Sequence, residues 1–142
     1  MLSRILVLAL FAVSVLRAAP ATPLFDGRTL AGWEGDTAWF RVFDRAIIAG
    51  SRTRPVPRNE FLVSTREFSD FELRLEVRLI GGQGNGGIQF RSQRVPGSHE
   101  MIGYQADVGP GYWGGLYDES RRNTLLGKRC DESALAAVLR PD

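Results

Sequence analysis

The stretch FELRLEVRL, residues 71–79, alternates apolar and charged side chains more regularly than any other part of the chain. One side of this pattern is apolar and the other is charged; the apolar side holds Phe71, Leu73, Leu75, Val77 and Leu79. A repeat of two residues is the period of a β-strand with one buried face. The pattern therefore predicts a half-buried strand over residues 71–79.

Shorter strand-like segments lie on both sides of this stretch. Residues 39–43 and 46–49 flank a two-residue turn and predict a hairpin, and residues 61–64 predict a short strand. GIQFRS (87–92) and MIGYQADV (101–108) are rich in β-forming residues, and the glycines of 81–87 suit the turn before them. Only DESALAAVL, residues 131–139, predicts a helix. Short strands joined by Gly and Pro turns predict an all-β fold, an antiparallel sandwich or barrel with a short C-terminal helix.

The N-terminus predicts export. Residues 1–21 carry an early cation, an apolar run too short to span a bilayer, and a small-residue exit at Ala19-Pro20-Ala21. We expect a signal peptide over residues 1–21, a domain over residues 22–142, and a periplasmic or secreted location. Without residues 1–21 the chain has 16 basic and 16 acidic residues, which argues against nucleic-acid or membrane partners. Cys130 is the only cysteine, so no intrachain disulfide can form.

Strand geometry sorts polar from apolar side chains in two of the predicted strands. In residues 101–108, alternate positions place Gln105 and Asp107 outward and Tyr104 inward. In residues 87–92 the same alternation places Gln89 and Arg91 outward. If the two strands share a sheet, these four residues form a polar patch of amides, a guanidinium and a carboxylate. Such a patch suits a sugar, whose hydroxyls each need a donor and an acceptor.

Aromatic residues follow this patch along the chain. Tyr112, Trp113 and Tyr117 lie beyond a Gly-Pro-Gly corner at 109–111, where their rings could cover the apolar face of a pyranose. The other interpretation is that they belong to the core, because Trp and Tyr are often largely buried. Asp118, Glu119, Arg121 and Arg122 fit a solvated turn with local ion pairs better than a ligand site.

Four blocks in order resemble the 3-keto-disaccharide hydrolase domain family: LFDGRTLAGWEG, EFLVSTREFSDFELRLEVRL, GNGGIQFRS and GYQADVGPGYWGGLYDESRR. The resemblance covers residues 23–142 and implies an exported jelly-roll sandwich similar to the concanavalin A-like lectins and glucanases. It implies action on glycosides oxidised at C3, in a groove whose blocks hold Asn85, Arg91, Gln105, Asp107, Tyr112, Trp113 and Tyr117. Similar chains continue past a segment like ALAAVLRPD, so we expect an incomplete sandwich without its C-terminal strands.

A ketone at C3 acidifies the proton on C2, so one base can remove it while the aglycone leaves C1, and water can then add back. For this chemistry we predict Asp107 as the base, Arg91 and Gln105 as donors to the C3 oxygen, and Glu100 or Glu119 as the acid. We place Gln89 and Asn85 among the substrate-binding residues. We expect no cofactor, while a metal requirement and a role for His99 stay open.

Two other function classes remain open at this stage. A non-catalytic carbohydrate-binding module would need only the aromatic rings and the polar patch. A structural or interaction domain would bind no sugar.

Overall fold

The computed structural model describes residues 20–127, which form eight strands. They are β1 (Trp33–Glu34), β2 (Phe40–Phe43), β3 (Ala46–Ala49), β4 (Val63–Ser64), β5 (Gly86–Arg94), β6 (Met101–Val108), β7 (Leu116–Glu119) and β8 (Thr124–Leu125). Every strand pairing is antiparallel, and residues 20–127 contain no helix, hence none that could cross a membrane. The all-β antiparallel prediction is therefore confirmed. The expected helix over 131–139, and the signal peptide apart from its last two residues, lie outside the described residues.

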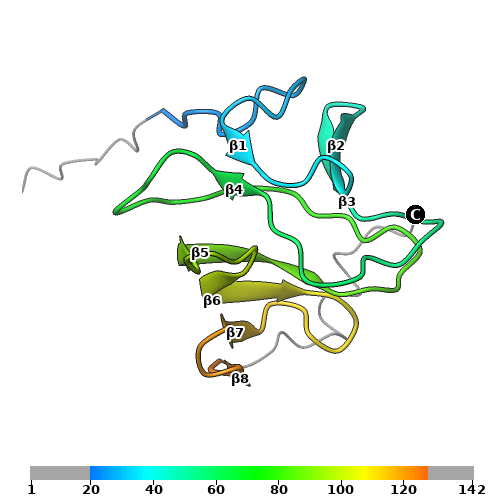
Figure 1. Cartoon of the computed structure of the whole chain (residues 1–142). Coiled ribbons are helices and arrows are strands. Elements are labelled where there is room, and N and C mark those ends of the chain that lie inside the picture. The colour runs from blue at the N-terminus through cyan, green and yellow to red at the C-terminus, as the bar shows by residue number, and fades with distance from the viewer. Residues whose placement is uncertain (1–19, 128–142) are drawn as a thin grey trace, which may run out of the picture.

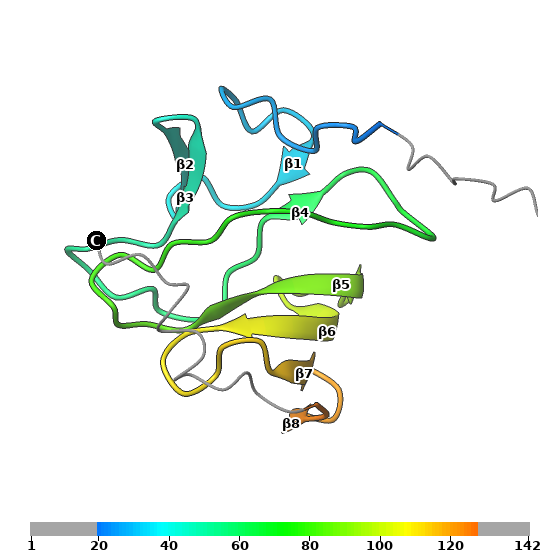
Figure 2. The same cartoon turned by 180° about the vertical axis from the view of Figure 1, so that it is seen from behind.

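The strands form three sheets of unequal size. β5, β6, β7 and β8 make a four-stranded sheet in that order, while β1 pairs with β4 and β2 pairs with β3. Figures 1 and 2 show the two small sheets above the four-stranded sheet, with the chain between β4 and β5 running between them. The closure of these sheets into a jelly roll stays a prediction.

The hairpin of β2 and β3 has the predicted position and turn. Asp44 and Arg45 both have positive φ angles, 47° and 60°. A two-residue turn with two left-handed residues matches the right-handed twist of the strands it joins. β2 begins at Phe40, whereas the predicted strand began at Trp39. Both of these side chains are buried, with 8% exposure.

Residues 71–79 do not form the strand that their alternation predicts. The structure assigns no strand between β4 and β5, and Phe71, Leu73, Leu75 and Val77 remain 41–49% exposed. The apolar side chains lie across the apolar face of β5 and β6 and line a groove with Ile88 and Phe90. Alternation fixes which side chains share a side, but a strand also needs a backbone partner, and residues 20–127 provide none for this segment.

Asp118 on β7 is the most deeply buried charged residue of the described chain, with no exposed surface. Arg121 Nε donates to its carboxylate at 3.0 Å and Arg122 Nη1 at 2.9 Å, so the expected local ion pairs are present. The expectation that Asp118 is solvated is wrong, because its side chain is fully buried. The guanidinium of Arg121 also lies 5.0 Å over the ring of Tyr104. Hydrogen bonds from Arg121 and Arg122 lower the pKa of Tyr104. This cluster fixes the turn between β7 and β8.

Replacing Asp118 by alanine should lower the free energy of unfolding by about 1–3 kcal/mol, because charge-assisted hydrogen bonds at a buried acceptor are lost. Chemical denaturation measures this value. Asp70→Ala is the matched control, because the Asp70 side chain is fully exposed and lies 3.8 Å from Arg91. It should change stability by less than about 0.5 kcal/mol. Equal effects of the two variants would contradict the structural role of Asp118.

Candidate functional site

The register of the four-stranded sheet brings predicted site residues from three strands onto one face. Gln89 on β5 lies opposite Gln105 on β6, which in turn lies opposite Tyr117 on β7. Asp107 is two residues further along β6, and Glu119 is two residues further along β7. We call this surface the polar face; its members are Gln89, Gln105, Asp107, Tyr117 and Glu119.

The other face of the same sheet is apolar, as the alternation predicts. Ile88 lies opposite Ala106, and Phe90 lies opposite Tyr104 with ring centroids 6.1 Å apart. Val108 continues this row and lines the same groove as Ile88. The sequence therefore predicted the two faces of β5 and β6 correctly at these positions.

Asp107 lies on the polar face but is buried, with 6% of its surface exposed. Its Oδ1 accepts a hydrogen bond from Gln105 Nε2 at 2.9 Å. Within residues 20–127 no cation pairs with it, in contrast to Asp118. The sequence placed the Asp107 side chain outward, on an exposed surface, and its burial differs from that prediction. Met101, on the same side of β6, is also buried, with 4% exposure. Burying a carboxylate costs free energy unless hydrogen bonds compensate it, so the position of Asp107 makes it a candidate site residue.

Gln89 supplies a donor without a partner. Its Oε1 accepts a hydrogen bond from Ser92 Oγ at 3.0 Å, while its Nε2 is shielded from solvent and has no partner among the described residues. Buried amide N–H groups are nearly always hydrogen-bonded in folded proteins. The orphan N–H of Gln89 is therefore a candidate to bind a ligand oxygen.

Glu119 is the residue on the polar face whose protonation is perturbed. Burial raises its pKa above the ordinary glutamate value, and the negative charges of Glu100 and Asp107 raise it further. Its Oε1 accepts a hydrogen bond from Asn59 Nδ2 at 3.4 Å. A carboxyl group that holds its proton at higher pH can donate it to a leaving group.

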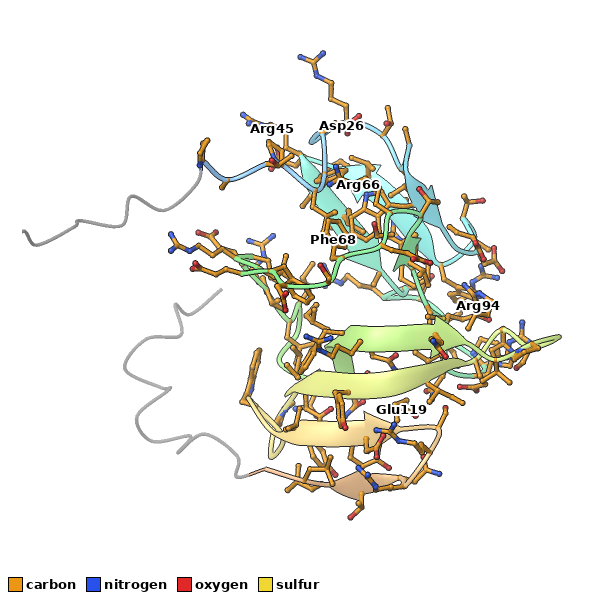
Figure 3. All side chains as sticks on the ribbon, turned by 90° about the vertical axis from the view of Figure 1, so that its left-hand side faces the viewer. Asp26, Arg45, Arg66, Phe68, Arg94 and Glu119 are labelled. Atoms are coloured by element: carbon orange, nitrogen blue, oxygen red, sulfur yellow. The ribbon has the colours of Figure 1, made fainter. Side chains whose placement is uncertain are left out.

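Glu100 lies just before β6 rather than among the residues of the polar face. Its Oε2 accepts from Ser120 Oγ at 3.2 Å, and its Oε1 lies 3.2 Å from His99 Nε2. His99 borders a pocket of about 290 Å³ with Arg58, Glu60 and Arg94. Figure 3 shows Arg94 and Glu119 at the same end of the four-stranded sheet. No described group of three or more His, Cys, Asp and Glu side chains could hold a metal ion.

Arg91 does not join the polar face, contrary to the sequence prediction. A β-bulge shifts the register between Phe90 and Gln93, and Arg91 within it has a φ of 50°. The bulge turns its side chain to the rim of the apolar groove, 3.8 Å from Asp70. The predicted guanidinium donor is therefore absent from the polar face.

The 109–115 turn places the predicted aromatic residues beside Asp107. Asp107 N donates to Gly115 O at 2.9 Å, and Gly114 N donates to Asp107 O at 3.0 Å. Tyr112 is 46% exposed in this turn, and Trp113 next to it is half-buried. The backbone of Asn85 lies against the turn: if Gly109 carried a Cβ, that atom would be 3.4 Å from the Asn85 Cα. The aromatic residues are thus near Asp107, whereas Asn59 and the His99 pocket lie toward Glu119.

Three residues near Glu119 were not assigned to the site from the sequence: Asn59, Arg58 and His99, whose role was left open. Residues 52–60 carry three arginines and two prolines, which indicate a solvated loop. The contact from Asn59 to Glu119 spans 60 positions in the chain. No local signal reports such a contact.

Gly87 makes room for the Gln105 side chain. A Cβ at Gly87 would collide with Cγ and Cδ of Gln105 and would lie 2.9 Å from Ala106 O. Gly87→Ala should therefore displace Gln105 from Asp107 and lower the free energy of unfolding by about 1–3 kcal/mol, the usual cost of overpacking. Gly86→Ala is the matched control, because a Cβ there meets no atom within 4 Å. Chemical denaturation of both variants checks this, and a Gly87→Ala protein as stable as wild type would contradict the close packing of Gly87 against Gln105.

Comparison with known proteins identifies the family. Neither the curated proteins nor the solved structures contain a significant match to the chain. Residues 20–141 match the model of the 3-keto-alpha-glucoside-1,2-lyase-like domain, which confirms the family that the four sequence blocks indicated. The match covers most of the 142 residues. The chain therefore belongs to the 3-keto-alpha-glucoside-1,2-lyase-like domain family.

Proposed function

We propose that the polar face binds a 3-keto-α-glucoside and eliminates its aglycone across C1 and C2. The observation that carries this proposal is the pairing on one face of two carboxyl groups in different environments. Asp107 is buried beside a neutral amide, while Glu119 has a raised pKa. A carboxylate and a second carboxyl group that holds its proton to higher pH, placed on one face, can act together as base and acid. The family name supports the substrate class.

In the proposed reaction the carboxylate of Asp107 removes the proton on C2, which the C3 ketone has made acidic. The electron pair of the broken C2–H bond delocalises onto the C3 oxygen as an enolate and then forms the C1=C2 double bond. The C1–O bond breaks, and Glu119 gives its proton to the departing aglycone oxygen. The products are a free alcohol and an unsaturated 3-keto sugar. Addition of water to its double bond would complete a net hydrolysis.

The amides of the polar face suit the developing negative charge. Gln89 has the unpartnered N–H, and Gln105 has a second N–H besides the one that it gives to Asp107. Donors placed before the reaction at the oxygen that gains charge stabilise the enolate without reorganisation. In this role Gln89 takes the place that the sequence assigned to Arg91.

The spacing of the two carboxyl groups fits an α-glucoside. Asp107 pairs with Gly115 and Glu119 pairs with Gly103, so the two residues are four positions apart along the strands. At about 3.3 Å per residue this offset is about 13 Å, which leaves room for a ring between the side chains. In the chair form of an α-glucoside the C2 hydrogen and the C1–O bond are axial on opposite ring faces. A ring standing between Asp107 and Glu119 presents one face to each residue.

A non-catalytic carbohydrate-binding module is the second candidate, favoured by the exposed ring of Tyr112. The decisive experiment incubates the protein with a 3-keto-α-glucoside and with the unoxidised glucoside, and measures product release and binding heat. Release of the aglycone from the oxidised substrate alone supports the elimination. Binding of both sugars without release supports the module, and no binding at all supports a structural domain.

We further propose that residues 1–21 direct export and that the mature domain begins near Ala21. The composition of the N-terminal segment supports this location. The intact mass of the protein from a cell-envelope fraction tests it. A mass that includes Met1 would contradict cleavage.

A further inference from the structure

Residues 71–79 combine strong β-forming character with an unpaired backbone. Within residues 20–127, the main chain of 71–78 makes no hydrogen bond. Phe71, Leu73, Leu75 and Val77 are 41–49% exposed, and the segment contains no Gly or Pro. An exposed apolar edge of this kind is a template for pairing with another strand.

The charged side chains of this segment are arranged so that it complements itself. Glu72, Arg74, Glu76 and Arg78 alternate in sign, and reversing the chain direction exchanges acidic for basic positions. If two copies pair antiparallel about Leu75, Glu72 lies opposite Arg78 and Arg74 lies opposite Glu76, each twice by symmetry. Opposite charges directly across a strand pair stabilise it. A parallel pairing in register would instead place like charges side by side.

We propose that residues 71–79 are a dimerisation strand whose partner is the same strand of a second copy of this chain. The pairing is two-fold symmetric, so each copy uses the same surface and the assembly closes at two chains. On the apolar side, Leu73 meets Val77 of the second copy and Leu75 meets Leu75. Glu72 and Arg74, which pair at 2.5 Å within one chain, are 69% and 82% exposed and so accessible to the second copy. This proposal is independent of the reaction proposed above.

Charge reversal tests the pairing. Glu72→Arg alone and Arg78→Glu alone each place like charges opposite one another at two symmetric positions. Each should raise the dimer dissociation constant about tenfold or more, measured by analytical ultracentrifugation over a concentration series. An equimolar mixture of the two variants restores both opposite-charge pairs, so it should form heterodimers with the wild-type affinity. Glu67→Arg, an exposed reversal outside the segment, is the control and should leave the constant unchanged.

Disulfide trapping tests the register. In a Cys130→Ser background, Leu75→Cys should form a disulfide-linked dimer on mild oxidation, because the two Cα atoms of a directly opposed antiparallel pair are about 4.5–5.5 Å apart. Glu72→Cys should not form one, because it faces position 78 of the second copy. A wild-type protein that stays monomeric at every concentration overturns the proposal. Charge variants that dimerise as tightly as wild type, or a disulfide yield equal at positions 72 and 75, overturn it too.

Discussion

Replacing Asp107 by asparagine should lower kcat for a 3-keto-α-glucoside by about a hundredfold or more, because a general base typically contributes at least that factor. The asparagine Oδ1 can still accept the hydrogen bond that Gln105 donates, so the geometry of the polar face is kept. What the variant loses is the ability to take the C2 proton. KM should change little, because the amide and the carboxylate have nearly the same shape. Steady-state kinetics on the purified variant measures both constants.

The matched control for this prediction is Asp70→Asn, because the Asp70 side chain is fully exposed and its nearest charged partner is Arg91, at 3.8 Å. It should retain wild-type turnover. Thermal unfolding of the Asp107→Asn protein must first show that it is folded. Turnover by folded Asp107→Asn within about threefold of wild type would remove Asp107 from the role of base.

Replacing Glu119 by glutamine should lower kcat for substrates with poor leaving groups by about a hundredfold or more. The reason is that the amide cannot donate the proton that the aglycone oxygen needs. For an aryl 3-keto-α-glucoside, whose phenolate leaves without protonation, kcat should fall much less. The wild-type rate requires protonated Glu119, so it falls as the pH rises through the raised pKa of this residue. The Glu119→Gln variant should lack this fall in rate at high pH, the alkaline limb of the pH profile. Rate profiles against pH for both substrates make the comparison.

Glu100→Gln provides the control for the cause of the pKa shift. The negative charge of Glu100 helps to raise the pKa of Glu119, so its removal should let Glu119 ionise at lower pH. The alkaline limb should then move to lower pH while the maximal rate is retained. An alkaline limb that persists unchanged in Glu119→Gln would show that another group is the acid.

The parts of the fold that could be predicted from the sequence are those with a local cause. Asp44 and Arg45 between two β-rich runs specify a two-residue turn, and the hairpin follows. Alternation over β5 and β6 assigns Gln89, Gln105 and Asp107 to one face because side chains in any strand alternate. These predictions needed no knowledge of distant contacts.

The predictions that failed concern features that depend on contacts distant in sequence or on irregular backbone. Residues 71–79 have the right side-chain period, but a strand forms only where another backbone supplies hydrogen bonds. Arg91 has the right parity, yet the bulge between Phe90 and Gln93 turns it to the opposite face. The burial of Asp107 and the contact of Glu119 with Asn59 come from segments packed together in three dimensions. No period or motif encodes them.

The central claim is that the polar face removes the proton from C2 of the sugar. The most direct measurement follows a 3-keto-α-glucoside labelled with deuterium at C2, by NMR, during turnover and in an enzyme-free control. If C2 is deprotonated, every molecule that releases its aglycone loses its label to solvent, with a primary isotope effect on the rate. Aglycone release with the deuterium retained on C2 would show that the bond is cleaved without C2 deprotonation, and would contradict the account.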